Sequence, residues 1–141
     1  MTIYADTSFF FSLYGSDAHS SEARRLIGSG PSIWFTPLHY AEWLHAIGQH
    51  VFRRAISPAE ALKLQADLDN DRTAGLWVET SLPEMALDTC ADLARRYGAR
   101  LGIRTLDSLH VASALELKAK QFWTFDDRQA KLAQTEGMQL N

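Results

Sequence analysis

The chain has 141 residues, which leaves room for one domain but not two, and 46% of them are hydrophobic, enough to build a single core. A formal net charge of −3 argues against a protein that holds nucleic acid on a generally basic surface, although divalent cations in an acidic pocket would reverse the local sign. The single cysteine, Cys90, cannot form an intrachain disulfide, and no leader segment or apolar run of membrane-spanning length is present, so we expect a cytoplasmic protein that does not enter a membrane.

The first residues form a short apolar run. Residues 2–5 predict a buried strand that delivers Asp6 to its carboxyl end. At that edge of an open α/β sheet, side chains commonly bind ligands. Asp6 could instead be only the N-cap of the helix that follows, and Thr7 or Ser8 could also cap this helix, which we expect to end near Gly15.

The next predicted elements are a helix over residues 20–27 and a buried strand over residues 33–35. Thr36 and Pro37 then have the residue types of an N-cap and of a first helical position. Glu42 lies about a turn and a half into the helix that they open, beside its apolar stripe. The stripe is expected to contain Leu38, Ala41, Leu44 and Ile47. A carboxylate so close to a core face is unusual without a partner, so Glu42 is a candidate site residue.

Two capping boxes with an internal proline predict the helices of the middle third. The box at residues 57–60 opens a helix whose far end, residues 67–72, is a solvated charge run. A third strand is expected at residues 76–79. The second box, at residues 81–84, then opens a helix that runs to Gly98.

The remaining acids lie near the start of the last two helices. Asp107 is in the first turn of a mostly buried helix, and Asp126 and Asp127 follow a fourth strand at residues 122–124. A final helix is expected over residues 128–136, and residues 138–140 could add an edge strand.

The sequence permits two interpretations for each of four histidines and for the tryptophans. His110 follows Asp107 by one helical turn, so it could donate a hydrogen bond to the site or be a buried structural histidine. His39, His45 and His50 share no spacing with the candidate acid of their helix, and we interpret them as surface or packing residues. The tryptophans are expected in the core, although an exposed Trp43 could stack on a nucleic-acid base.

Strands alternate with helices along the whole chain, which predicts an α/β fold with a mainly parallel sheet of four or five strands and helices on both faces. The strands that precede Asp6 and Asp126 then end at the same edge, and helices after other strands begin there. Four acids can therefore converge: Asp6, Glu42, Asp107 and Asp126.

Four converging carboxylates require charge compensation. Two unit charges about 4 Å apart repel by roughly 4 kcal/mol at an effective dielectric near 20, so protons or cations must relieve the repulsion. Thr7, Ser8 and Thr124 could add oxygen contacts, and the chain has no Cys or His cluster with zinc-like spacing. An all-oxygen site favours Mg²⁺ or Mn²⁺, which would activate a water for in-line attack on a phosphodiester.

The chain resembles PIN-domain nucleases, and in particular the toxins of VapBC toxin–antitoxin modules. The resemblance is carried by four segments in family order: residues 4–8, 36–42, 104–115 and 123–126. It implies one PIN-like domain over residues 1–141 with magnesium-dependent endoribonuclease activity. It also implies an RNA substrate, a cognate antitoxin that inserts into the site, and a homodimer.

By motif position, the resemblance assigns catalytic roles to Asp6, Glu42, Asp107 and Asp126, and metal binding to Asp6, Asp107 and Asp126. Thr7, Ser8 and Thr124 would support these acids as water or ligand contacts. The last motif contains two adjacent acids, so Asp127 could take or share the role given to Asp126.

The sequence agrees less well with other functions. A phosphatase of the haloacid dehalogenase type needs a second acid two residues after the first, where this chain has Ser8. A receiver domain needs an acid pair after its first strand and a phosphoacceptor after a middle strand. A stand-alone RNA-processing nuclease is the alternative within the family. A non-catalytic binding module would use the acids only as caps and bind a partner through residues 9–11 and the neighbouring helices.

Overall fold

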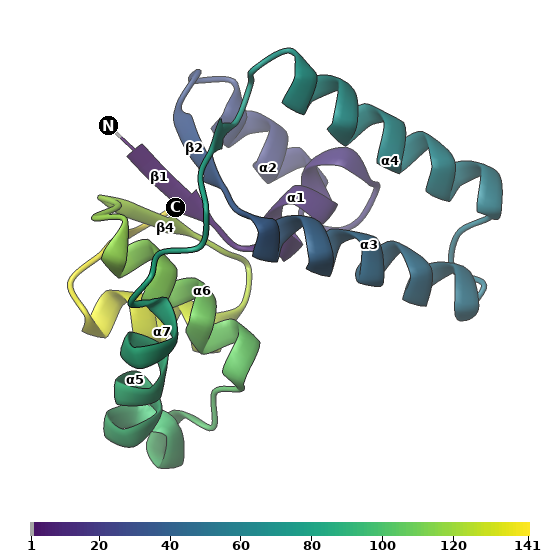
Figure 1. The fold of residues 1–141 in the computed structure, drawn as a ribbon. Helices are drawn as coiled ribbons and strands as arrows, with labels where there is room; N and C mark the ends of the chain where they lie inside the picture. Colours follow the sequence, from purple (N-terminus) through teal and green to yellow (C-terminus); the bar gives the residue numbers. More distant parts are fainter. Residues whose placement is uncertain (1) are drawn as a thin grey trace.

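A five-stranded sheet crosses the molecule in the computed structural model, which describes residues 2–141 (Figure 1). Its strands are β1 (Thr2–Ala5), β2 (Ser32–Phe35), β3 (Val78–Glu79), β4 (Gln121–Trp123) and β5 (Gln139–Leu140). Their spatial order is β3-β2-β1-β4-β5, and every neighbouring pair is parallel. The predicted α/β class and the parallel sheet are therefore confirmed.

Helices cover both faces of this sheet. Within the described residues they are α1 (Thr7–Tyr14), α2 (Ser20–Ile27), α3 (Pro37–Phe52), α4 (Pro58–Thr73), α5 (Ala86–Leu101), α6 (Thr105–Glu116) and α7 (Asp127–Thr135). Because strand side chains alternate, Ile3 and Ala5 of β1 enter one core while Tyr4 enters the other. The first core lies under α1 to α4 and the second under α5 to α7 (Figure 1).

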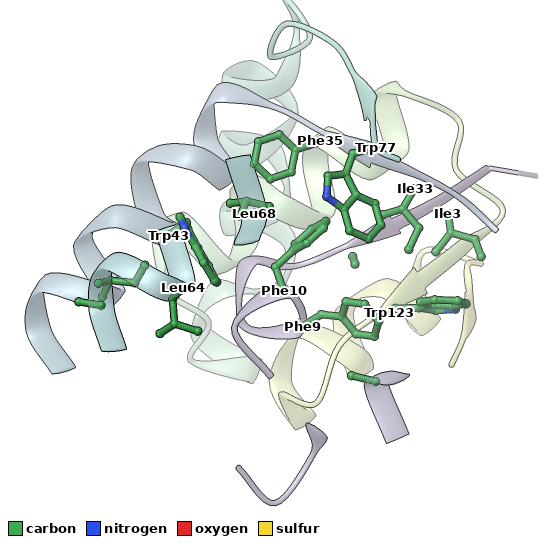
Figure 2. Close-up of a cluster of buried hydrophobic side chains, with 14 residues drawn as sticks. Ile3, Phe9, Phe10, Ile33, Phe35, Trp43, Leu64, Leu68, Trp77 and Trp123 are labelled. Carbon is green, nitrogen blue, oxygen red and sulfur yellow. The ribbon is translucent and has the colours of Figure 1, made fainter. Parts of the chain in front are cut away.

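Aromatic rings fill the core under α1 to α4 (Figure 2). Phe10 packs edge-on against Phe35 and Trp77, with ring centroids 5.4 and 5.2 Å apart. Phe9 and Phe10 are buried, with at most 1% of either residue exposed. Residues 9–11 therefore do not offer a continuous surface to a partner, which weakens the binding-module alternative.

The buried face of α3 differs from the predicted one. His39, Trp43 and Ile47 point into the protein, whereas Leu44 is 37% exposed. The large indole explains the difference, because Trp43 packs against the rings of Phe11 and Tyr14 on α1. Trp43 itself is 1% exposed, so the expectation that it could stack on a base is wrong.

One of the two predicted capping boxes is present in the structure. At residues 57–60 the two reciprocal hydrogen bonds of the capping box form at 3.1 Å. The box predicted at residues 81–84 does not open a helix. Pro83 lies in a turn whose carbonyl accepts from the N–H of Ala86, and α5 begins only after this turn. The same helix ends at Gly102, which has a left-handed φ of 62°, and not at Gly98.

Strand 76–79 was predicted too long, since only Val78–Glu79 pairs with β2. Trp77 is instead buried in the core under α1 to α4. The final helix was predicted to within one residue at each end. No helix of residues 2–141 combines the length and apolar character needed to cross a bilayer.

Candidate active site

Asp6 lies where β1 ends and α1 begins, and the backbone fixes it beside β4. Its N–H donates to the carbonyl of Trp123 at 3.1 Å, and its Oδ1 accepts from the N–H of Phe9 at 2.9 Å. Asp6 is therefore the N-cap of α1, and the expectation that Thr7 or Ser8 caps this helix is wrong. The capping role does not compete with a site role, because the second carboxylate oxygen stays free of the cap.

That second oxygen is held by side chains from α7 and from the residue after β4. Oδ2 of Asp6 accepts from Thr124 Oγ1 at 2.7 Å and from Gln129 Nε2 at 3.0 Å. Ser8 Oγ lies 2.9 Å from both carboxylate oxygens. Burial raises the pKa of Asp6, although the hydrogen bond from Thr124 opposes the shift. The site therefore favours a proton or a cation next to this carboxylate.

Glu42 reaches the same region from α3 and is bound by a chain of buried groups. Thr7 Oγ1 donates to Glu42 Oε1 at 2.8 Å, and His110 Nε2 of α6 contacts the same oxygen. Tyr4 O–H lies 2.7 Å from His110 Nδ1, so donation by the phenol leaves the Nε2–H to bind Glu42. Burial acts to raise the pKa of Glu42, but the hydrogen bonds from His110 and Thr7 lower it overall. His110 thus combines both predicted roles, since it is buried and holds a site carboxylate.

Asp107 and Asp126 come from the starts of α6 and α7. Burial and the nearby charge of Asp126 raise the pKa of Asp107. Asp126 is the N-cap of α7, where its Oδ1 accepts from the N–H of Gln129 at 2.9 Å. The N–H of Asp126 donates to Thr124 Oγ1 at 3.0 Å. The Thr124 hydroxyl therefore connects Asp126 to Asp6.

One cavity of about 480 Å³ is lined by all four predicted acids, Asp6, Glu42, Asp107 and Asp126. Thr7 and Ser8 line it as well, while Thr124 lies behind Asp6. Asp17, which the sequence did not single out, adds a fifth carboxylate to the wall. Asp127 is exposed on the first turn of α7 and does not line the cavity.

A larger cavity of about 770 Å³ lies between α3 and the β3 region but has different chemistry. Its one carboxylate, Glu79, accepts from Arg72 Nη2 at 2.7 Å. The Arg72 guanidinium also lies 4.4 Å from the ring centroid of Tyr40. The acids are therefore concentrated in the smaller cavity.

The sequence profile of the PIN domain matches residues 3–134 of the chain. The chain belongs to the PIN-domain family. No curated protein is detectably similar to it in sequence.

Solved structures share the fold at low sequence identity. VapC20 of Mycobacterium tuberculosis, described as a sarcin–ricin loop cleaving toxin, is 18% identical, with a TM-score of 0.71 over 96% of this chain and 95% of that one. A chain of FitAcB from Neisseria gonorrhoeae is 14% identical, with a TM-score of 0.72 over 98% of this chain and 95% of that one. A chain of Rickettsia felis VapBC2, solved with a promoter DNA fragment, is 14% identical, with a TM-score of 0.68 over 100% of this chain and 98% of that one.

The donors of this PIN-domain cavity suit a hard divalent cation. The acids and hydroxyls supply only oxygen, and Gln129 Oε1 is a buried carbonyl oxygen without a hydrogen-bond partner. Among residues 2–141, no three His, Cys, Asp or Glu side chains are grouped closely enough to share an ion as they stand. The oxygens of Asp6, Glu42 and Asp126 accept instead from protein donors. The donor chemistry therefore fits Mg²⁺ or Mn²⁺, and the side chains would exchange some of these hydrogen bonds for the ion.

Gln129 is, with Asp17, a cavity residue that the sequence did not single out. Its Nε2 donates to Asp6 at 3.0 Å and lies 3.4 Å from Asp107 Oδ1, so one amide lies between two carboxylates. Its position three residues after the N-cap Asp126 is typical of a capping box. That pattern predicts a bond back to the cap, whereas the side chain reaches Asp6 across the sheet edge. Only the tertiary structure reveals this contact.

His39 supports the backbone next to Asp6. Its Nε2 lies 2.7 Å from the carbonyl of Ala5, the residue before Asp6, and its Nδ1 accepts from the N–H of Thr36 at 3.0 Å. Complete burial lowers the pKa of His39 to about 3, so the ring is neutral at physiological pH. Among the three histidines of α3, His39 is therefore a packing residue, as expected.

Proposed function

We propose that this PIN-domain protein is a magnesium-dependent endoribonuclease and the toxin of a VapBC-type module, with one nuclease domain over residues 1–141. The observation that carries the proposal is that Asp6, Glu42, Asp107 and Asp126 line a single cavity although they lie far apart in the chain. Such a cavity is suited to divalent-cation chemistry on a phosphodiester.

In this proposal Asp6, Asp107 and Asp126 hold the cation. Thr124 and Ser8 orient the Asp6 carboxylate through their hydroxyls, at 2.7 and 2.9 Å. When bound, Mg²⁺ would lower the pKa of a coordinated water and balance the charge that develops on the phosphodiester.

Glu42 has a different role from the other three acids. Its lowered pKa keeps it ionised, and Thr7 and His110 fix one of its oxygens. The carboxylate can then accept a hydrogen bond from the attacking water and orient it toward phosphorus.

The partners follow from the relatives. VapC20 is described as cleaving the sarcin–ricin loop, and VapBC2 is a toxin–antitoxin complex, which supports an RNA substrate and a cognate antitoxin. We propose a homodimer for the active protein and a cytoplasmic location. A small protein with a DNA-binding N-terminus encoded next to this gene would support the toxin role over a stand-alone RNA-processing enzyme.

The test is an RNA-cleavage assay on the purified chain with structured RNAs, with Mg²⁺, with Mn²⁺ and with a chelator. We expect cleavage only when the divalent ion is present, and loss of cleavage by about a hundredfold or more in Asp6→Asn and Asp107→Asn.

Asp127→Asn is the matched control, because Asp127 is next to Asp126 but does not line the cavity. It should cleave like the unmodified protein. Equal cleavage by Asp6→Asn and the unmodified protein would show that the activity comes from a contaminant or from another site.

A further inference from the structure

Two stacked ring pairs form part of the wall of the acidic cavity. His19 stacks on Phe125 with ring centroids 4.5 Å apart and an interplanar angle of 5°. Phe11 stacks on His50 with centroids 4.4 Å apart and an angle of 27°. All four rings line the cavity that holds the candidate acids.

Both pairs are held by neighbouring groups, and the His19–Phe125 pair ends in solvent. Phe125 stacks in turn on the buried Phe9, with centroids 5.9 Å apart, while His19 is exposed at the outer end of the stack. His50 and Phe11 are half-buried. His50 Nδ1 lies 2.7 Å from the carbonyl of Ala46, which fixes the plane of its ring.

The charges of the cavity limit how a polyanion can bind. Five carboxylates and no Lys or Arg line it within the described part of the chain. Phosphates therefore gain little from the protein's own charges, since cationic side chains normally supply the sequence-independent part of RNA affinity. Besides a cation held by the acids, the remaining source of affinity is contact with the bases, which are uncharged and flat.

We infer that the His19–Phe125 and Phe11–His50 pairs are stacking sites for unpaired nucleobases that flank the phosphodiester held at the acids. The inference rests on the proposed function, because it places RNA in this cavity, and it narrows the substrate to single-stranded or splayed-out segments. A base on each pair extends an existing stack by one ring. In a duplex the bases stack on one another, so they are not available to these pairs.

The test uses a short single-stranded RNA that carries 2-aminopurine, a base whose fluorescence falls when it stacks. Titrations are made with the full chain carrying Asp107→Asn in Mg²⁺ buffer, and a gel of the same samples reports whether the RNA stays intact. We expect quenching on binding, and a rise in Kd of about tenfold in His19→Ala and in His50→Ala.

His45→Ala is the matched control for His50→Ala. Both histidines are on α3 and both place Nδ1 2.7 Å from the carbonyl four residues earlier, but His45 lies outside the acidic cavity. This variant should keep the parental Kd. His19→Phe and His50→Phe should also keep affinity and quenching, because they retain an aromatic ring.

Three results would overturn the inference: binding without quenching, equal affinity for the corresponding duplex, or a Kd that His19→Ala and His50→Ala leave unchanged. If the alanine variants only lower the melting temperature, the ring pairs are packing contacts.

Ring-dependent quenching with no cleavage by the unmodified chain would refute the nuclease but keep the base sites. If cleavage depends on Asp6 but RNA binding does not depend on the rings, the base sites are refuted and the nuclease is kept.

Discussion

Asp107 is a carboxylate in an unfavourable place. Burial and the neighbouring Asp126 raise its pKa above the usual 3.8, so the folded protein holds the ionised form at a cost. A group with a raised folded pKa stabilises the protein fully below its unfolded pKa, and this stabilisation is lost as the pH rises through the folded pKa.

Asp107→Asn should therefore raise the melting temperature in metal-free buffer at neutral pH. The gain over the unmodified protein should shrink as the pH falls toward 3.8, where the native carboxyl is protonated. Thermal melts followed by circular dichroism from acid to neutral pH measure both effects. A clear drop in melting temperature at neutral pH would mean that Asp107 is a structural residue.

Gln129 is buried, and its amide separates Asp6 from Asp107. Gln129→Leu has a similar volume but removes the donor to Asp6, so we expect a loss of about 1–3 kcal/mol in the free energy of unfolding in metal-free buffer. Urea denaturation measures the change. Gln134→Leu, on the exposed side of the same helix, is the control and should change stability little. Equal effects of the two variants would contradict the bridging role.

Three elements, β1, α6 and α3, are joined by one line of hydrogen bonds. Tyr4 of β1, His110 of α6 and Glu42 of α3 are connected in series inside the protein. The line explains how a carboxylate on α3 is held at the edge formed by β1 and α6.

Tyr4→Phe should break this line without opening a large cavity. It leaves His110 Nδ1 buried without its donor, which should lower the free energy of unfolding by about 1–3 kcal/mol. It should also weaken cleavage, because Glu42 loses its fixed orientation. Tyr40→Phe is the control, since Tyr40 is half-buried and its contact with Arg72 depends on the ring. An active Tyr4→Phe protein of normal stability would refute the role of the line.

Sequence patterns predicted the elements wherever local chemistry decided them. The capping box at residues 57–60 and the Thr36–Pro37 helix start were found because their hydrogen bonds lie within one turn. The box at residues 81–84 failed because Pro83 turns the chain first. The buried face of α3 was misplaced because packing of the Trp43 indole overrode the aliphatic pattern.

The candidate site was predictable for a topological reason. Strand ends in a parallel sheet share an edge, so acids after β1 and β4 had to come together. The contacts of Gln129 and the stacked ring pairs were not predictable, because each joins side chains from segments far apart in the chain.

For the whole molecule, acid stability should depend on His39. Its folded pKa of about 3 lies below the ordinary 6.5, so the stabilisation is present above pH 6.5 and is lost as the pH falls toward 3. Between pH 6.5 and 5 the loss should be about 2 kcal/mol. Urea unfolding at several pH values measures it, and His39→Gln should show a smaller loss over this interval. An identical pH dependence in the two proteins would mean that the ring is not held neutral.

The central claim is that Asp6, Asp107 and Asp126 bind a divalent cation together. Calorimetric titration of Mn²⁺ into the unmodified protein, Asp6→Asn, Asp107→Asn and Asp127→Asn tests this directly. We predict binding to the unmodified protein, a loss of affinity of at least about tenfold in Asp6→Asn and Asp107→Asn, and no change in Asp127→Asn. Mn²⁺ binding of the same strength in all four proteins, or in none of them, would contradict the account.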